Sequence, residues 1–372
     1  MARTLVRRVV VEVGNALHVG DGEPLSPFEY AVTDGELRRL SLSRLAAALD
    51  EAGLCDLEAA AGRGARDVQA LLASQKFADA VETATMYRCR LTAAARDVLE
   101  NPRGAKTAAL EVASVARTAD GRPILPGSSV KGAIRTALLT RLLQLAEARG
   151  DRPPEAAVKD KSASRLEAWL LTGKDDMAPG EDPLRCLAVS DLSLGDASDP
   201  AGVVAVDACR RGKREEQGTG VPSLREVALG WAHPDRPAAG GATFVGELRV
   251  SALAREFIAR AVASEWRREF FSRGAQGLFV EIVKACVLAY FPFPGSPNAP
   301  QGALDAETED WVKKRVAEAS GAKRAFFPLV LGWGSGLEAV TLDSEGRRAT
   351  PTTRWWTSAG TRLGAVFVEA RS

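Results

Sequence analysis

The chain has 372 residues, 46% of them hydrophobic and 26% charged, which is typical of a globular protein large enough for two domains. Its formal net charge of +1 excludes a strongly basic nucleic-acid binder, so any bound RNA must follow a local basic strip. No run of 18 apolar residues occurs and no apolar signal segment follows Met1, so we expect a cytoplasmic protein without membrane spans.

The first half of the chain is predicted to mix strands with helices. β-Branched residues predict a strand over 5–13, and the glycine- and proline-rich stretch from Gly14 to Pro27 predicts a loop. Apolar residues at helical spacing predict helices over 41–52, 65–73, 128–148 and 163–172. Further strands are expected near 84–92 and 107–115, and a polar loop is expected over 150–162.

The second half continues this mixture. Strands are expected over 185–194, 203–207, 224–231, 243–250, 326–331 and 363–369. Helices are expected over 252–272, 276–290 and 305–319, with a proline-rich break over 292–300. Because strands and helices interleave without regular βαβ alternation, the pattern predicts an α+β fold with antiparallel sheets.

The most informative stretch is Ile124-Leu-Pro-Gly-Ser-Ser-Val-Lys-Gly-Ala-Ile-Arg135. Proline and glycine end an extended run there, and Ser128 or Ser129 is expected to cap the helix that follows. From Val130 onwards, apolar residues recur at helical spacing and form one stripe that faces a core.

Two cations lie in the first two turns of this helix, Lys131 and Arg135. The helix dipole is already positive at this end, so each cation costs up to about 1 kcal/mol when no anion is nearby. A phosphate would reverse the sign, because free N–H groups and both cations would converge on it, and Gly132 would let its backbone approach. The pattern therefore predicts a phosphate site; an ordinary surface helix with solvated cations is the alternative.

Two further segments are candidates for contacts with RNA. Gly332-Trp-Gly-Ser-Gly336 has glycines at alternate positions, so its backbone N–H groups can cup a phosphate and Trp333 can stack on a base or pack in the core. The densest basic cluster, Cys209-Arg-Arg-Gly-Lys-Arg214, lies between two predicted strands and would form a hairpin tip. Its four cations are Arg210, Arg211, Lys213 and Arg214. They would contact RNA phosphates and give affinity that does not depend on the RNA sequence; the alternative is a basic turn exposed to solvent.

Metal and cofactor chemistry is not indicated. Five scattered cysteines without a Cys-x-x-Cys pair, and only two histidines, argue against a zinc site. Neither a Walker A loop nor a Gly-x-Gly-x-x-Gly motif is present, so we expect no bound cofactor. His18 could serve an RNA-cleaving site, but only His233 could partner it, so a structural or RNA-contact role for His18 is favoured.

Several of these segments resemble the RAMP superfamily of CRISPR effector proteins. The resemblance rests on 124–135, the first loop over 16–30, Leu187-Ala-Val-Ser-Asp191, 224–227 with 241–247, and Gly332–Gly336. Its Leu-Ser-Pro-Phe-Glu-Tyr portion is most similar to the fifth subunit of the type III-A Csm complex. The matches occur in the expected order over nearly the whole chain.

The resemblance implies two ferredoxin-like (RRM-type) domains: 1–235, with a thumb-like basic hairpin that would kink the guide RNA, and 236–372, with the glycine-rich loop. It also implies a non-catalytic subunit that caps the 3′ part of the crRNA in an antiviral, RNA-targeting complex. Its partners would be crRNA, target RNA paired to the guide, and backbone and small Csm subunits. The implied RNA contacts are Ser128, Ser129, Lys131, Arg135, His18, the basic hairpin, Gly332, Trp333, Gly334 and Gly336.

Two alternatives stay open at the sequence level. The first is a RAMP endoribonuclease that processes repeats through His18 or slices target RNA. The slicing subunits of the superfamily carry an aspartate before the Pro-Gly-Ser-Ser helix, and Asp21, Asp34 and Asp120 occupy that interval here without the expected flanking residues. The second alternative is a RAMP subunit of another type III complex.

Overall fold

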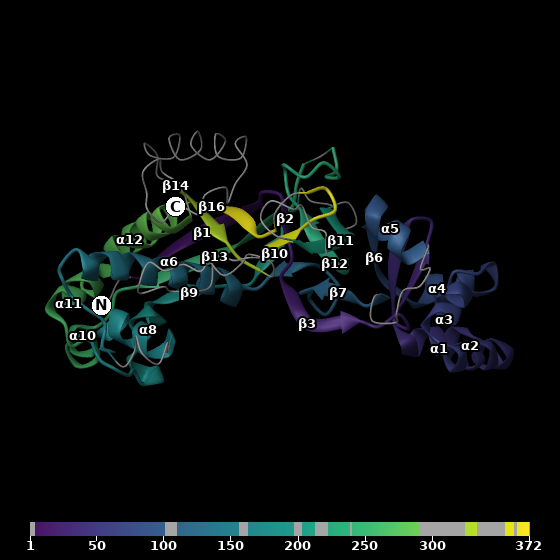
Figure 1. Cartoon of the computed structure of the whole chain (residues 1–372), viewed down its shortest axis with the longest axis horizontal. Coiled ribbons are helices and arrows are strands. Elements are labelled where there is room, and N and C mark those ends of the chain that lie inside the picture. The colour runs from purple at the N-terminus through teal and green to yellow at the C-terminus, as the bar shows by residue number, and fades with distance from the viewer. Residues whose placement is uncertain are drawn as a thin grey trace.

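The computed structural model describes residues 4–100, 110–155, 163–196, 203–212, 222–238, 240–290, 324–332, 354–360 and 363–371. These residues form two β-sheets and several groups of helices along an elongated molecule (Figure 1). No helix within these ranges is both long and apolar enough to span a bilayer.

The first sheet is antiparallel, with the strand order β14-β16-β1-β13-β10-β8, and β9 also pairs with β13. Its strands are β1 (Thr4–Val13), β8 (Ile124–Leu125), β9 (Leu187–Val189), β10 (Leu192–Leu194), β13 (Thr243–Ser251), β14 (Arg324–Val330) and β16 (Ala365–Arg371). β1 has a continuous partner on each side, which buries Val9, Val11 and Val13 and explains its β-branched sequence.

The second sheet is mixed, with the order β3-β7-β12-β11-β6-β5-β4, while β2 pairs with β12 and β15 with β11. Its strands are β2 (Ala16–Leu17), β3 (Gly20–Leu25), β4 (Tyr30–Thr33), β5 (Glu36–Leu40), β6 (Thr85–Leu91), β7 (Val112–Val115), β11 (Val204–Gly212), β12 (Ser223–Leu229) and β15 (Arg354–Trp356). Two pairs, β6–β11 and β7–β12, are parallel, and the other ladders are antiparallel.

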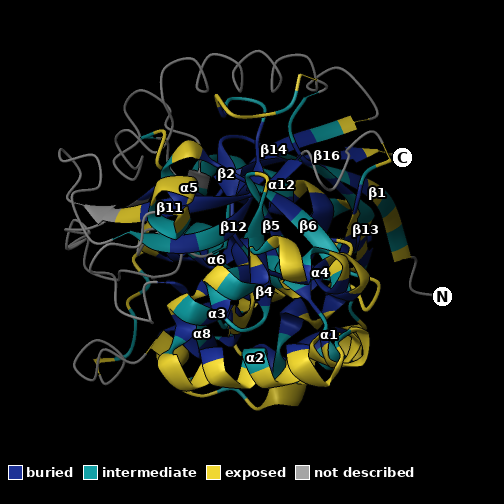
Figure 2. Ribbon diagram, turned by 90° about the vertical axis from the view of Figure 1, so that its right-hand side faces the viewer, coloured by how far each residue is buried: buried dark blue, intermediate teal, exposed yellow. Residues whose placement is uncertain are grey.

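Helices gather at both ends and over the first sheet (Figure 1). The α-helices are α1 (Leu42–Ala48), α2 (Glu51–Arg63), α3 (Ala65–Leu72), α4 (Ala78–Ala84), α5 (Ala93–Glu100), α6 (Gly127–Glu147), α8 (Ala163–Thr172), α10 (Arg255–Ala261), α11 (Glu265–Phe271) and α12 (Gly274–Tyr290), and short 3₁₀ turns lie at Gln75–Phe77, Pro179–Glu181 and Pro183–Cys186. The lobe α1–α4 has its own small core around Phe77, and its outer helices α1 and α2 are mostly exposed (Figure 2).

The first sheet and its two long helices have ferredoxin-like connectivity. In chain order the unit runs β1, α6, β9/β10, β13, α12 and β16, and the strands lie in the spatial order fourth, first, third, second. Helices α6 and α12 pack on each other and on this sheet, and they bury the face that it turns toward them. The second sheet is made of segments inserted between β1 and α6, between β10 and β13 and, for β15, between β14 and β16. The predicted α+β, ferredoxin-like fold is confirmed.

Most of the predicted helices and strands are present. Their boundaries differ from the prediction where contacts with residues distant in sequence decide the local structure. The predicted loop from Gly14 to Pro27 contains β2 and β3, because β3 gains a partner in β7 that local sequence does not show. The predicted strand over 185–194 is broken into β9 and β10, because Asp191 turns toward α6. The predicted helix over 252–272 is two helices, α10 and α11, and the helix expected over 305–319 lies outside the described residues.

The predicted boundary between residues 235 and 236 falls in the connection from β12 to β13. Strands from both sides of it pair directly, since β1 lies between β13 and β16. The first sheet therefore draws on both of the predicted segments, and the second sheet also takes β15 from the C-terminal one.

Candidate RNA-binding site

The start of α6 is held by a carboxylate from a distant loop. The backbone N–H of Gly127 donates to Asp191 Oδ1 at 2.8 Å, and a Cβ on Gly127 would lie 2.3 Å from the Val189 carbonyl oxygen. The expected caps Ser128 and Ser129 are inside the first turn, and the cap position is Pro126 without a side-chain bond. The capping prediction was therefore wrong, because Asp191 takes the role expected of a serine.

The exposed part of the first turns is small and basic. Ser128 and Gly132 are exposed, Ser129 and Lys131 are partly exposed, and a Cβ on Gly132 would meet nothing within 4 Å. Within the described residues Lys131 makes no ion pair. This surface is therefore open to an anionic backbone, with Lys131 as its cation.

Arg135 is already neutralised within the fold. Its guanidinium forms ion pairs with Glu167 on α8 and, at 2.6 Å, with Asp182 Oδ2. The cost of a cation near the positive end of the helix is thus offset by two protein carboxylates. The charge argument that called for an external phosphate applies to Lys131 and not to Arg135.

His18 is a buried residue with a defined tautomer. Its Nδ1–H donates to the Glu226 carbonyl oxygen at 2.7 Å, and its Nε2 faces Arg225 Nη1 at 3.3 Å. Burial, with a smaller contribution from the nearby Arg225 charge, lowers the pKa of the imidazole to about 4, so the ring is neutral at pH 7. A neutral imidazole engaged on both nitrogens is arranged for structure rather than for proton transfer.

The structure brings His18 next to the beginning of the glycine-rich motif. Gly332 has φ +82°, and a Cβ there would lie 2.5 Å from the His18 carbonyl oxygen. Glycine is required by both the backbone conformation and the close approach. Trp333, Gly334 and Gly336 lie outside the described residues.

The first loop and the start of α6 are also neighbours. Ala116 N–H donates to the Val19 carbonyl, and Ile124 N–H donates to the Ala116 carbonyl, both at 2.9 Å. Two strand spacings of about 4.8 Å therefore separate the residues beside His18 from the strand that leads into α6. Three of the predicted segments, far apart in sequence, thus lie side by side.

The basic cluster begins at the end of β11, which pairs with β12. β11 and β12 are antiparallel, with Cys209 opposite Ser223, and Arg210 is exposed in β11 opposite Trp356 of β15. Arg211 lies in β11, although its side chain is not described, and Lys213 and Arg214 lie outside the described residues.

The three aspartates considered for RNA cleavage do not converge. Asp21 accepts from Ser114 Oγ at 3.1 Å on β3. Asp34, at φ 54°, lies in the β4–β5 turn and pairs with Arg38, and Asp120 bonds Thr118 in a separate exposed turn. Among the described residues, no group of three or more histidine, cysteine, aspartate or glutamate side chains could hold a metal ion.

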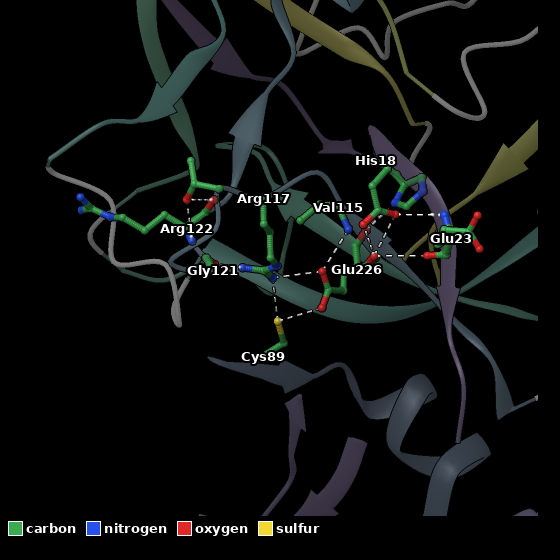
Figure 3. Close-up of polar contacts among 11 residues, drawn as sticks. His18, Glu23, Cys89, Val115, Arg117, Gly121, Arg122 and Glu226 are labelled. Carbon is green, nitrogen blue, oxygen red and sulfur yellow. Dashed lines mark hydrogen bonds and ion pairs between the residues drawn. The ribbon is translucent and has the colours of Figure 1, made fainter. Parts of the chain in front are cut away.

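A buried charge network lies beneath the first loop (Figure 3). Glu226 is fully buried, accepts from Arg117 Nη2 and from the Val115 N–H, each at 3.0 Å, and lies 3.5 Å from the Cys89 thiol. The Arg117 guanidinium covers the Tyr87 ring at 3.7 Å. These contacts join β6, β7 and β12 around Glu226, whose backbone carbonyl also accepts the hydrogen bond from His18.

Comparisons with known proteins agree with this fold. The family model of the RAMP superfamily matches residues 11–321. A chain in a cryo-EM structure of a Csm–crRNA–target RNA ternary complex of a type III-A CRISPR–Cas system has a TM-score of 0.61 and 18% identity, over 98% of this chain and 100% of that one. Csm5 of T. onnurineus, in a crystal structure, has a TM-score of 0.57 and 18% identity, over 96% and 99%. No curated protein matches.

Sequence reasoning missed the residues that hold the site in place. Asp191 lies in a segment noted for its resemblance, but its bond to Gly127 depends on β9 and β10 meeting α6. Glu226 follows Arg225 in an ordinary strand pattern, and nothing local marks it as buried. A charged residue at a core-facing strand position was the only available signal.

Proposed function

This chain belongs to the RAMP superfamily, and we propose that it is a crRNA-binding, non-catalytic subunit of a type III-A CRISPR effector complex. In that role it caps the complex at the 3′ part of the guide and serves antiviral RNA targeting in the cytoplasm. Its partners are the crRNA, the target RNA paired to the guide, and backbone and small subunits of the complex.

One observation carries the proposal: the chain follows, over 98% of its length, the fold of a chain from a Csm–crRNA–target RNA complex. That chain is matched over its entire length. The likeness to Csm5, again over nearly all of both chains, favours the same position in the complex.

The geometry supports RNA contact at the start of α6. Ser128, Lys131 and Gly132 offer a hydroxyl, an ammonium group without an ion pair among the described residues, and an open backbone on adjacent turns. Such a surface suits a phosphodiester, whose charge complements the helix dipole. His18 and Gly332 lie against each other, two hydrogen-bonded strands away from the strand that leads into α6.

The geometry of His18 favours a non-catalytic role. General acid–base catalysis wants a group whose pKa lies near the working pH, whereas burial lowers the pKa of His18 to about 4. Its Nδ1–H is committed to a backbone carbonyl, and Asp21 bonds Ser114. If His18→Ala or Asp21→Ala abolished cleavage of labelled repeat or target RNA, the endoribonuclease alternative would replace this proposal.

The decisive experiment reverses the charge of Lys131. The complex is assembled with Lys131→Glu, and the bound RNA is quantified by absorbance ratio and sequenced. We expect RNA affinity to fall about tenfold. The slope of log affinity against log salt concentration should decrease by about one, because one phosphate contact is lost. Full-length crRNA at wild-type occupancy would contradict the phosphate site.

Two control variants make the result specific. Arg44→Glu makes the same charge change in the exposed first turn of α1, at the other end of the molecule, and should leave RNA binding unchanged (Figure 1). Arg135→Glu removes two internal ion pairs, so its main effect should be a lower free energy of unfolding. Sequencing also shows whether the RNA is a type III-A guide or belongs to another type III complex.

A further inference from the structure

A second group of donors lies on the second sheet, away from α6. Arg88 and Arg90 of β6 point to the face opposite Cys89, since side chains alternate along a strand. Arg88 is paired with Glu82 and, at 3.8 Å, with Glu36. Arg90 has no hydrogen bond or ion pair with any described residue, and its Nε and Nη2 atoms are shielded from solvent.

His233 is the second donor without an acceptor. It is fully buried in the turn after β12, and its Nδ1 accepts from the Asp235 N–H at 3.2 Å. That bond places the ring proton on Nε2, which is buried and has no hydrogen-bond partner in the described part of the chain. In the β6–β11 ladder Arg90 lies opposite Ala205, two residues before Asp207 and on the same face of the sheet, and both Arg90 and Asp207 act electrostatically on this imidazole.

The buried carboxylate of Asp207 is directed to other donors, and no hydrogen bond joins it to Arg90 or His233. Asp207 Oδ1 accepts from Thr92 Oγ1 at 2.8 Å and from Ser358 Oγ, and Oδ2 accepts from the Ser358 N–H at 2.9 Å and lies 3.8 Å from the Cys209 thiol. Glu36 lies opposite Arg90 in the ladder, but its carboxylate is directed to Arg88. What is missing is an acceptor oxygen.

We propose that Arg90 and His233 form a second anion subsite, at the foot of the β11–β12 hairpin, that takes a phosphate oxygen of bound RNA. A buried donor without an acceptor lowers the stability of the fold, so an acceptor that arrives with a ligand is strongly favoured. The Arg90 residue is only partly buried, so part of it lies at the surface, whereas His233 lies inside.

RNA is the favoured source of this phosphate because β11, which carries Asp207, continues into the basic cluster at Arg210. The inference rests on the proposed function, since it assigns a second phosphate of the same RNA. The second phosphate contact differs in location from the one proposed above: it is made by the second sheet and not by α6.

The test compares two arginines on one strand. The intact complex, or the full chain with labelled single-stranded RNA, is titrated as wild type, Arg90→Gln, Arg90→Lys and Arg88→Gln over a range of salt concentrations. We expect Arg90→Gln to weaken binding about tenfold and to reduce the salt slope by about one, Arg90→Lys to recover part of the affinity, and Arg88→Gln to match wild type. Equal effects of Arg90→Gln and Arg88→Gln, or none from either, overturn the subsite.

Two further arms separate the possible failures. If Lys131→Glu weakens RNA binding while Arg90→Gln does not, the subsite is wrong and the proposed function stands; if the wild-type complex carries no RNA, the proposed function falls as well. Inorganic phosphate serves as the second probe. If it raises the unfolding midpoint of wild type but not of Arg90→Gln while RNA affinity is the same in both, the site takes a free anion and the RNA assignment is overturned.

Discussion

Charged side chains inside the second sheet are expected to decide how this chain responds to single substitutions. Glu226 is fully buried against Arg117, and the neutral variant Glu226→Gln would leave that guanidinium without its charge partner. Breaking one side of a buried pair costs about 3–5 kcal/mol. We expect a loss of this size in the free energy of unfolding, measured by urea denaturation.

The control for this substitution is an exposed pair of the same type. Glu247→Gln breaks an ion pair with Arg249 on the open face of β13, where the cost should stay below about 1 kcal/mol. Similar losses for Glu226→Gln and Glu247→Gln would show that the network in Figure 3 is not a buried one.

The titration of His18 gives a pH-dependent prediction. Its folded pKa of about 4 lies below the ordinary histidine pKa of 6.5, so between these values the unfolded chain binds a proton that the folded chain does not. Stability from this group is therefore complete above pH 6.5 and is lost as pH falls toward 4, by roughly 3 kcal/mol in all. His18→Gln should flatten this part of the stability profile.

The measurement is the urea midpoint of wild type and His18→Gln between pH 7.5 and 4.5. Burial also lowers the pKa of His233, so a residual slope of the same sign is expected in the variant. Parallel profiles for the two proteins would mean that His18 is not protected from protonation.

At the scale of residues, the sequence indicated which cations could bind an anion but not which of them are already paired with carboxylates of the same chain. Lys131 and Arg135 look equivalent on a helical pattern, yet Arg135 meets Glu167 and Asp182, which are 32 and 47 residues away. Arg88 and Arg90 differ in the same way. Ion pairing depends on tertiary neighbours, so local spacing cannot separate a ligand-binding arginine from a structural one.

At the scale of elements, two glycines of α6 have opposite roles. A Cβ on Gly127 would lie 2.3 and 2.4 Å from the carbonyl oxygens of Val189 and Ser190, which are fixed backbone atoms. A Cβ on Gly132 would meet nothing within 4 Å. The first glycine permits close packing of the β9–β10 loop on the helix, whereas the second only lowers helix propensity.

We therefore expect Gly127→Ala to destabilise the fold by about 1–3 kcal/mol and Gly132→Ala to stabilise it by up to about 1 kcal/mol. Urea midpoints of the two variants check this contrast. If RNA approaches the first turns of α6, Gly132→Ala should also bind RNA more weakly although it folds better. A Gly127→Ala protein as stable as wild type would contradict the packing of Asp191 and its loop on α6.

Elements with a strong local period were predictable and those made by pairing were not. Helix α8 was predicted at its observed bounds, and β1, α6, α12 and β13 within a few residues, because each has a sustained apolar pattern. Strands β2 and β3 lie in a glycine- and proline-rich stretch and exist because β12 and β7 lie beside them. Their neighbours, not their composition, make them strands.

At the scale of the molecule, the ferredoxin-like unit is assembled from both ends of the chain. β1 lies between β13 and β16, so the first strand is completed by residues from beyond position 243. The inserted second sheet carries the basic hairpin, and the unit itself carries α6. Long-range closure of this kind leaves no trace in local sequence patterns, which is why the α+β class was predictable and the strand order was not.

This closure predicts how a divided chain behaves. Expressed alone, residues 1–235 lack both neighbours of β1, and residues 236–372 lack the strand between β13 and β16, so neither fragment should unfold cooperatively. Co-expressed, the two should purify together, because β1 then regains its partners and buries Val9, Val11 and Val13. Hydrogen exchange of the β1 amides measures this directly, with protection expected only in the paired fragments. A cooperative transition from residues 1–235 alone would show that the second sheet and its helices fold without the ferredoxin-like unit.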